Sequence, residues 1–185
     1  MFRIGIFSGS KDPKPESSQG DIVEALREIG SQLPTQMVEV HYGGGESGLM
    51  GFIPRTFEAN GGSVVGHNYI GFDRCKIGKE IMYPTFDERQ LQLILNSDVI
   101  LVLPGGVGTA SELFDVLVRN DVGLWSPQRK VILFNYKNFF EPIYQLLENG
   151  FQCGFVKKTT LDNIVLTNTV DETVRLIRNE IVDTQ

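Results

Sequence analysis

Residues 103–112 read Leu103-Pro104-Gly105-Gly106-Val107-Gly108-Thr109-Ala110-Ser111-Glu112. They continue the apolar run 98–103, so a predicted strand leads through glycines into the start of a predicted helix. Free backbone N–H groups at a helix N-terminus, together with the helix dipole, attract an anion, and glycines let that anion approach the backbone closely. The stretch therefore predicts a phosphate site, for a nucleotide or a sugar phosphate.

The rest of the chain alternates short β-branched runs with helical patterns, which is typical of a parallel sheet covered by helices on both faces. We predict a doubly wound α/β fold in a single domain, residues 1–185. The predicted strands are 2–7, 37–42, 63–66, 98–103, 130–135 and 163–166, with a further short strand near 80–82. The predicted helices are 21–33, 48–60, 86–96, 110–120, 140–149 and 171–182.

Composition narrows the class of partner. The formal net charge is −6, and the 17 Lys and Arg residues are scattered, so the chain lacks the basic footprint of a nucleic-acid binder. Cys75 and Cys153 have neither CxxC nor Cys/His ligand spacing, which favours a reducing compartment over a zinc site or a disulfide scaffold. The N-terminal apolar run is too short for a signal peptide, and no apolar run reaches bilayer-spanning length. We expect a cytoplasmic protein that binds a small molecule and neither nucleic acid nor membrane.

Two more glycine-bearing loops follow predicted strands, and ligands of open α/β sheets bind beyond the carboxyl ends of strands. The loop Ser8-Gly9-Ser10 is by itself more typical of a tight turn, with Ser10 as a candidate ligand contact. The loop 42–51 offers Gly43, Gly44 and Gly45 to a base, ribose or phosphate, although Gly48 and Gly51 also fit a role in helix packing. Neither GxGxxG nor GK[ST] occurs, so support for an NAD or ATP site is weak.

Thr109 and Glu112 allow two interpretations. The spacing Thr-x-x-Glu is that of a capping box, in which Thr109 caps the helix and Glu112 reaches back to the N-terminal N–H. Alternatively, a carboxylate in the first turn of a phosphate-binding helix lies within reach of the sugar, where it stabilises developing positive charge. This placement favours chemistry for Glu112.

The motifs Gly43-Gly44-Gly45-x-x-Gly48-Leu49-Met50-Gly51 and Pro104-Gly105-Gly106-x-Gly108-Thr109-x-x-Glu112 resemble the paired motifs of the LOG family. These proteins are cytokinin-activating phosphoribohydrolases, often mislabelled lysine decarboxylases, and the similarity runs over most of the chain. The resemblance implies a Rossmann-like homodimer that hydrolyses the N-glycosidic bond of a nucleoside 5′-monophosphate, of adenine type or N6-modified AMP, to free base and ribose 5-phosphate. It implies no metal and no organic cofactor.

The family pairs the helix glutamate with an arginine in a Met-His-x-Arg-Lys motif. The matching segment here is Phe86-Asp87-Glu88-Arg89-Gln90, which keeps the arginine and replaces the methionine, histidine and lysine. The resemblance implies that Arg89 and Glu112 are the catalytic residues, with Arg89 anchoring the substrate and orienting Glu112. It places Gln90 at a substrate-binding position. Without the resemblance, Arg89 is better interpreted as a charge on a helix surface.

These motifs together predict a mechanism. Gly105, Gly106, Gly108 and Thr109 hold the 5′-phosphate through backbone N–H groups and a hydroxyl. As the bond to the base breaks, C1′ becomes oxocarbenium-like, and Glu112 stabilises that cation or positions the attacking water.

Other side chains are weaker candidates. Glu46 lies in a glycine loop but fits a solvated carboxylate better, and His41 and His67 fit the edge of the core better than a catalytic role. Core packing is the favoured use of three side chains that also suit a base pocket, namely Met82, Tyr83 and Phe86.

Two further functions and one assembly stay open. The fold also suits a nucleotide sensor or carrier without catalysis. A pyridoxal phosphate-dependent decarboxylase needs a Schiff-base lysine beside the phosphate cup, and no lysine lies in either glycine motif. The predicted helix 86–96 carries four apolar side chains, which is more than one helix face needs for burial: Leu91, Leu93, Ile94 and Leu95. The surplus apolar surface fits a dimer interface.

Overall fold

The computed structural model of the chain describes residues 1–14, 19–125 and 128–184. Its parallel strands form one seven-stranded sheet in the order β4-β3-β2-β1-β5-β6-β7. The strands are β1 Phe2–Phe7, β2 Val38–Tyr42, β3 Ser63–Tyr69, β4 Lys79–Tyr83, β5 Val99–Val102, β6 Lys130–Phe134 and β7 Ile164–Thr167. Because β1 lies between β2 and β5, the carboxyl ends of β1 and β5 flank the crevice where such sheets bind ligands.

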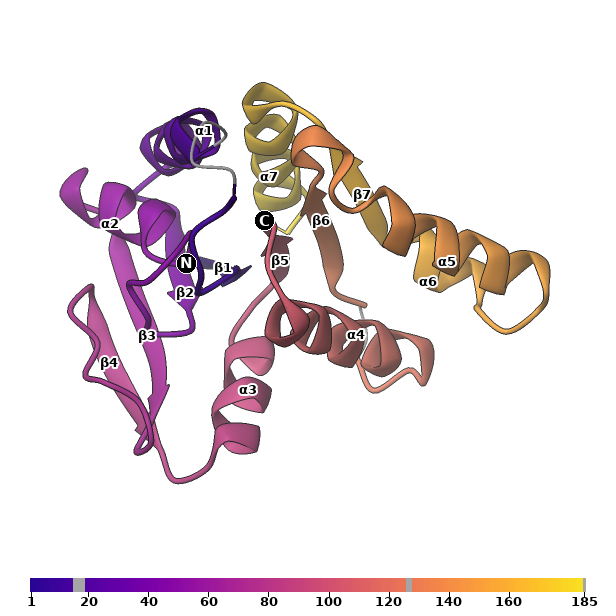
Figure 1. Cartoon of the computed structure of the whole chain (residues 1–185), viewed down its shortest axis with the longest axis horizontal. Coiled ribbons are helices and arrows are strands. Elements are labelled where there is room, and N and C mark those ends of the chain that lie inside the picture. The colour runs from indigo at the N-terminus through magenta and orange to yellow at the C-terminus, as the bar shows by residue number, and fades with distance from the viewer. Residues whose placement is uncertain (15–18, 126–127, 185) are drawn as a thin grey trace.

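Helices cover both faces of this sheet, which confirms the predicted doubly wound, Rossmann-like architecture. They are α1 Gln19–Gln32, α2 Phe52–Ala59, α3 Phe86–Leu95, α4 Val107–Asp121, α5 Glu141–Gln152, α6 Lys158–Asp162 and α7 Val170–Asp183, with a 3-10 turn at Tyr136–Asn138. Figure 1 shows α1 and α7 on one side of the sheet and α3 and α4 on the other. None of the helices in the described part of the chain has the length and apolar character that a bilayer crossing needs.

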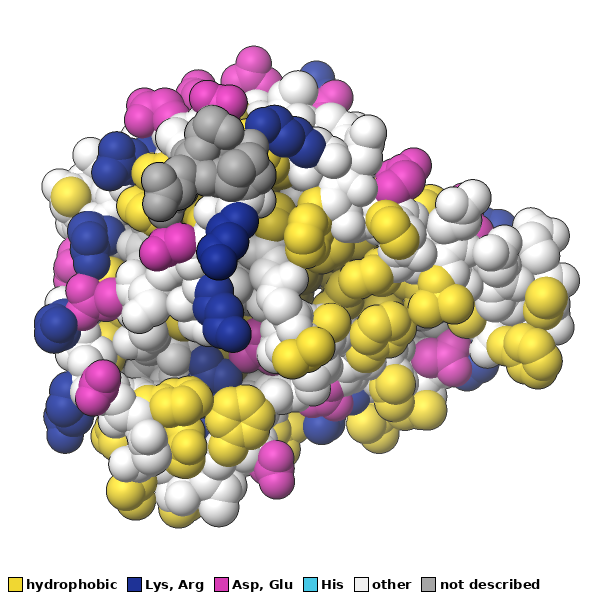
Figure 2. Space-filling view, viewed as in Figure 1, with side chains coloured by type: hydrophobic (Ala, Val, Ile, Leu, Met, Phe, Trp, Pro, Cys, Tyr) yellow, Lys and Arg dark blue, Asp and Glu magenta, His cyan; other side chains and the backbone are white. Residues whose placement is uncertain are grey.

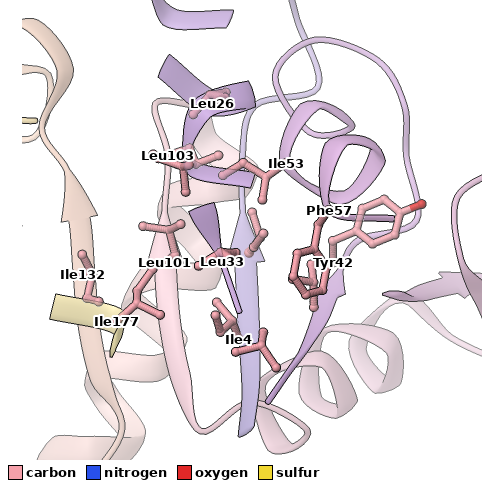
Figure 3. Packing of buried hydrophobic residues seen from close by; sticks show 14 of the residues in the cluster. Ile4, Leu26, Leu33, Tyr42, Ile53, Phe57, Leu101, Leu103, Ile132 and Ile177 are labelled. Carbon is pink, nitrogen blue, oxygen red and sulfur yellow. The ribbon is translucent and has the colours of Figure 1, made fainter. Parts of the chain in front are cut away.

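The core lies in two layers, one on each face of the sheet. In the first, Ile4 and Leu101 of the sheet pack with Leu26 of α1, Phe57 of α2 and Ile177 of α7 (Figure 3). The second joins the sheet to α3, α4 and α5 through Phe7, Ile94, Val102, Leu113 and Leu147. Burial on both faces explains why the strands are continuous apolar runs in the sequence.

The structure corrects several predicted boundaries. The predicted helix 48–60 begins only at Phe52, because Gly48 has a φ of +61°, a left-handed conformation that a helix excludes. Residues 48–51 instead form a turn held to the first loop, where Leu49 N donates to Gly9 O. The short strand near 80–82 is confirmed as β4, and its pairing with β3 extends β3 to Tyr69, beyond the predicted end at 66. Helix α6 was not predicted.

Candidate functional site

A cavity of about 700 Å³ lies at the carboxyl ends of the central strands. The loops after β1, β2, β3 and β5 form its walls, together with the first turns of α3 and α4. The three glycine-bearing loops of the sequence therefore converge as predicted. Every predicted ligand contact except one lines this cavity: Ser10, Gly43, Gly44, Gly45, Arg89, Gly105, Gly106, Gly108, Thr109 and Glu112.

Gln90 is the exception. Its side chain is half-buried, its Nε2 lies 3.5 Å from Asp115 Oδ2 on α4, and it is not among the residues that line the cavity. Neighbouring residues on a helix point about 100° apart, and here Arg89 faces the cavity while Gln90 is turned toward α4. The structure does not bring Gln90 to the predicted substrate site.

The start of α4, where the sequence predicts an anion site, lies at the cavity wall, and it lacks the capping box. The helix begins at Val107 with Gly106 as its N-cap, so Thr109 lies inside the first turn and Glu112 points to another partner. A Cβ placed on Gly106 or Gly108 would meet no heavy atom of the described residues within 4 Å, apart from its chain neighbours and the backbone of its own helix. The first-turn N–H groups of a 15-residue helix therefore lie beside open space in the cavity wall.

Ser8 is a cavity residue that sequence reasoning did not select. It follows β1 directly, it is 5% exposed, and its Oγ has no hydrogen-bond partner among the described residues. Buried hydroxyls are rarely left unpaired, so an unpaired one in a cavity wall indicates a place for a ligand atom. Its position at a strand end beside a glycine was the available signal.

Arg89 and Glu112 form a buried ion pair on the cavity wall, with Arg89 Nη1 2.9 Å from Glu112 Oε1. Arg89 also donates from Nε to His67 O at 3.0 Å and from Nη2 to Gly43 O at 2.9 Å. A Cβ at position 43 would lie 1.9 Å from Arg89 Nη2, so only glycine leaves room for the guanidinium. Arg89 is 4% exposed, and the interpretation as a surface charge is wrong.

The environment of this pair sets its chemistry. Burial raises the pKa of Glu112 above its ordinary value, and the positive charge of Arg89 limits the rise. Glu112 Oε2 accepts no hydrogen bond from a described residue, although Glu112 lines the cavity. A carboxylate that is oriented by one oxygen and unsatisfied at the other is suited to proton transfer or to stabilising a cation.

The rest of the cavity wall mixes aromatic and charged side chains. Phe86, weighed above for a base pocket, lines the cavity, whereas Met82 and Tyr83 do not. Further lining residues had no sequence signal of their own and are brought together only by the fold: Lys11, Asn68, Phe72, Arg74, Lys76 and Phe139. Lys11 and Lys76 are exposed at the cavity and lie outside both glycine motifs.

Glu46 also lines the cavity, but its carboxylate is already engaged. One oxygen lies 2.7 Å from Arg55 Nη2, and the other lies 3.6 Å from Lys76 Nζ. Glu46 therefore pairs with cations beside the second glycine loop, and it is half-buried rather than the solvated carboxylate that the sequence favoured.

His41 and His67 lie inside the sheet rather than in the cavity. His41 Nδ1 is 2.8 Å from His67 Nε2, and the chain of hydrogen bonds continues to Glu39 at one end and to the Tyr83 hydroxyl at the other. Burial lowers the pKa of His67 from 6.5 to about 3, and the nearby charges of His41 and Arg89 add to this effect. Both rings are therefore structural, as the sequence favoured. Among the described residues, no group of three or more His, Cys, Asp or Glu side chains is placed to hold a metal ion.

Comparisons with known sequences find relatives along most of the chain. The family described as "Possible lysine decarboxylase" matches residues 35–177. The chain is 28% identical over 178 residues to a "Probable cytokinin riboside 5'-monophosphate phosphoribohydrolase" of Oryza sativa subsp. japonica, covering 94% of this chain and 77% of the relative. It is 27% identical over 182 residues to a cytokinin riboside 5'-monophosphate phosphoribohydrolase of Arabidopsis thaliana, covering 94% of this chain and 80% of the relative.

Solved structures match the fold along nearly the whole chain. A protein designated TM1055 superposes with a TM-score of 0.72 at 23% identity, covering 97% of this chain and 99% of the other. The molybdenum cofactor carrier protein of Chlamydomonas reinhardtii superposes with a TM-score of 0.70 at 16% identity, covering 98% of each chain. At these identities the likeness shows the fold alone. The sequence match, by contrast, spans most of the chain and both glycine motifs, and the chain therefore belongs to the LOG, or possible lysine decarboxylase, family.

Proposed function

We propose that this chain hydrolyses the N-glycosidic bond of a nucleoside 5′-monophosphate, of adenine type or N6-modified AMP, to the free base and ribose 5-phosphate. The observation that carries the proposal is the buried Arg89–Glu112 pair on the cavity wall. Glu112 comes three residues after Thr109, in the helix whose first turn would attract the phosphate. The Arabidopsis thaliana relative is named as a cytokinin riboside 5'-monophosphate phosphoribohydrolase and the Oryza sativa relative as a probable one, which supports the same reaction class.

The phosphate would bind at the start of α4. Backbone N–H groups of Gly105, Gly106 and Gly108 and the hydroxyl of Thr109 surround this part of the cavity, and Ser8 Oγ supplies an unpaired hydroxyl. Such a cradle binds a dianion through hydrogen bonds and the helix dipole without requiring a cationic side chain. Holding the phosphate there fixes the ribose near Glu112, one turn further along the helix.

The reaction breaks the bond between C1′ and the base nitrogen. The bonding electrons leave with the base, C1′ becomes oxocarbenium-like, and a water oxygen then bonds to C1′ while its proton is passed on and the departing nitrogen gains a proton. Glu112 stabilises the cation or accepts the proton of the attacking water. Arg89 holds Glu112 in place through Oε1, so Arg89 orients the carboxylate whether or not it also contacts the substrate.

A direct test incubates the purified chain with AMP, GMP, CMP and N6-modified AMP, and measures free base by chromatography and ribose 5-phosphate by a coupled assay. We expect base release by the native chain and binding without release by Glu112→Gln, which keeps the volume of the side chain and removes its charge. Base release by Glu112→Gln at the native rate would contradict the proposal.

A nucleotide-binding protein without catalysis is the second candidate. The observation that favours it is the replacement of the family's methionine, histidine and lysine by Phe86, Asp87 and Gln90, which removes positive charge near the site. The same assay separates the two candidates. Binding of a nucleotide with no release of base by the native chain would favour the sensor or carrier.

We also propose a homodimer, on a different surface from the one the sequence indicated. Leu93 and Ile94 are buried in the chain's own core, so α3 contributes only the half-buried Leu91 and the exposed Leu95. Val118 of α4 and Val122, the C-cap residue of that helix, are 56% and 59% exposed and are spaced to share one helix face. Light scattering at micromolar concentration tests the assembly, and a monomeric mass would contradict it.

A further inference from the structure

The first loop of the cavity, residues 8–11 after β1, is packed between the other two glycine loops. A Cβ placed on Gly9 would lie 2.9 Å from Gly105 Cα, and a Cβ placed on Gly48 would lie 2.5 Å from Lys11 N. Both distances are shorter than side chains tolerate, so the backbone of the first loop is in close contact with the loop before α4 and with the loop after β2. Lys11 is therefore held where the three loops meet.

Lys11 brings an ammonium group to the end of the cavity where α4 begins. It lines the cavity, it is exposed, and it comes two residues after Gly9, a span of at most about 7 Å. The flexible four-carbon stem of lysine covers a distance of this size, so the ammonium reaches an anion at the first turn of α4. Figure 2 shows dark blue side chains in the middle of the view, where Figure 1 draws the segment between β1 and α1, and the basic residues described in that segment are Lys11 and Lys14.

The other cationic side chains of the cavity already have carboxylate partners. Four Lys and Arg side chains line the cavity, and three of them form ion pairs: Arg74 with Glu80, Lys76 with Glu46 and Arg89 with Glu112. The fourth, Lys11, forms neither an ion pair nor a side-chain hydrogen bond with a described residue. Its charge is therefore available to a ligand.

The donors at the start of α4 carry no net charge. Backbone N–H groups of the first turn are joined there by the buried hydroxyls of Ser8 and Thr109, and Ser8 Oγ has no partner among the described residues. Such donors bind a phosphate oxygen whether the group carries one negative charge or two, and the helix dipole adds only about half a positive charge. A full ammonium charge, by contrast, attracts each added negative charge. Lys11 is therefore the group at this end of the cavity that responds to the charge of the phosphate.

We infer that Lys11 is a specificity-determining residue, which selects a phosphate monoester, a dianion, over a phosphodiester, which carries one charge. The inference rests on the proposed function for the place of the phosphate. A free nucleoside 5′-monophosphate presents the monoester, with a charge of about −1.5 to −2 at neutral pH. A nucleotide that is joined through its phosphate to a second group presents the diester. The site therefore takes mononucleotides in preference to dinucleotides.

Binding to the Glu112→Gln protein tests the inference without turnover. Calorimetry at about pH 8, where a phosphate monoester is a dianion, compares AMP and ribose 5-phosphate with the methyl ester of AMP, which has one charge, and with adenosine, which has none. We expect Lys11→Gln in this background to raise the Kd for AMP and for ribose 5-phosphate at least about fivefold. The Kd for the methyl ester should rise less than about twofold, and that for adenosine should not change. Lys11→Arg, which keeps the charge, should bind AMP within about twofold of the protein that has Lys11.

The matched control is Lys14→Gln, because Lys14 is exposed in the same segment and is not among the residues that line the cavity. It removes the same charge from the molecule, so an effect of net charge alone would appear in both variants. We expect Lys14→Gln to change the Kd for AMP less than about twofold. Raising the NaCl concentration from about 0.05 M to 0.5 M should weaken AMP binding more in the protein that has Lys11 than in Lys11→Gln, since salt screens this contact.

The outcomes separate this inference from the proposed function. An equal effect of Lys11→Gln on AMP and on its methyl ester, or an effect on AMP no larger than that of Lys14→Gln, overturns the inference about Lys11 alone. AMP binding that depends on Lys11, with no base released by the native chain, overturns the hydrolase proposal and leaves the inference about Lys11 standing. Absence of binding of both AMP and ribose 5-phosphate by a folded protein, checked by circular dichroism, overturns both.

Discussion

Two arginine–carboxylate pairs lie at opposite ends of the same sheet. Arg3 and Asp98 meet at the amino ends of β1 and β5, with Arg3 Nη2 2.7 Å from Asp98 Oδ1. Arg89 and Glu112 meet beyond the carboxyl ends, at 2.9 Å. The contact distances are similar, but the side chains of Arg3 and Asp98 are 35% and 23% exposed, and those of Arg89 and Glu112 are 5% and 12% exposed.

The pKa values of the two carboxylates are shifted in opposite directions. Burial favours a higher pKa for Asp98, but two side-chain hydrogen bonds and one backbone hydrogen bond from Arg3 outweigh it, and the pKa of Asp98 lies below its ordinary value. Glu112 has one hydrogen bond from Arg89, and burial raises its pKa. The two pairs therefore differ in what they leave free: both oxygens of Asp98 are bonded to Arg3, whereas Glu112 Oε2 is left for a ligand.

The largest expected difference between the pairs is in turnover. Glu112→Gln should lower the rate of base release at least about 100-fold, because it removes the charge that stabilises C1′. Asp98→Asn should leave the rate per folded molecule unchanged and lower the free energy of unfolding by about 1–2 kcal/mol. Base release and urea unfolding of both variants check this contrast. Equal loss of turnover in the two variants would show that the position of the pair in the sheet does not matter.

Replacing the arginine of each pair should lower the free energy of unfolding by different amounts. Arg89→Met leaves the Glu112 charge buried without a partner, at a cost of about 3–5 kcal/mol in the free energy of unfolding. Arg3→Met leaves Asp98 partly in water, at a cost of about 1 kcal/mol. Denaturant unfolding at neutral pH measures both. The double variant Arg89→Met with Glu112→Gln should recover part of the stability, and no recovery would mean that the lost packing of Arg89, rather than the stranded charge, is the cause.

As the pH falls, the free energy of unfolding should first decrease because of the hydrogen-bonded pair His41–His67, whose His67 O accepts from Arg89, and only at lower pH because of Asp98. Burial lowers the pKa of His67 to about 3 from 6.5, so the unfolded chain binds a proton that the folded chain refuses as the pH falls below 6.5. The free energy of unfolding should drop by about 2 kcal/mol between pH 6.5 and pH 5 from this group. Asp98 has a pKa below its ordinary value of 3.8, so its contribution to the free energy of unfolding is present above pH 3.8 and is lost only as the pH falls below that value. His67→Gln, measured at the same two pH values, should show a flatter dependence, and an unchanged slope would assign the effect elsewhere.

The pH dependence of turnover should report Glu112. If the ionised carboxylate stabilises C1′, kcat falls as protons bind, with the midpoint above the ordinary value of 4.5 because burial raises the pKa of Glu112. A kcat profile from pH 4 to pH 8, restricted to the range in which the protein stays folded, measures the midpoint. A midpoint below pH 4.5 would mean that, with substrate bound, the positive charge of Arg89 lowers the pKa of Glu112 by more than burial raises it.

The smallest expected effect is at Gln90. Because its amide lies against Asp115 and not in the cavity, Gln90→Ala should change KM and kcat by less than about twofold. Steady-state kinetics of base release check this. A large rise in KM would show that Gln90 turns into the cavity when substrate binds.

The alternation of elements and the positions of the glycine loops were predictable because they depend on short-range patterns. Strand burial on both faces produces apolar runs, and a glycine after a strand is visible in the sequence itself. The pairing of Arg89 with Glu112 came from the family resemblance, and the structure brings the two side chains together. Local spacing allowed a capping box beside the chemical role of Glu112, and the capping box is wrong because α4 begins at Val107, so Thr109 cannot be its cap.

Other parts of the site depend on the tertiary structure. Gln90 was placed at the substrate through its position in a motif, and the rotation of α3 turns it toward α4 instead. Ser8 and Phe72 carry no distinctive pattern, and they become cavity residues only because the loops after β1 and β3 end at the same edge of the sheet. The order of the strands in the sheet decides which side chains line the same cavity wall. That order cannot be predicted from any single segment of the sequence.

The space reserved for the Arg89 guanidinium at Gly43 has a consequence for comparing distant sequences. The two residues are 46 positions apart, and Arg89 requires glycine at position 43, since a Cβ there would lie 1.9 Å from Arg89 Nη2. A homologue that loses the arginine is freed to accept alanine there, and one that keeps the arginine is not. Glycine at position 43 together with arginine at position 89 would thus mark relatives that retain the buried Arg89–Glu112 pair, before any of them is expressed.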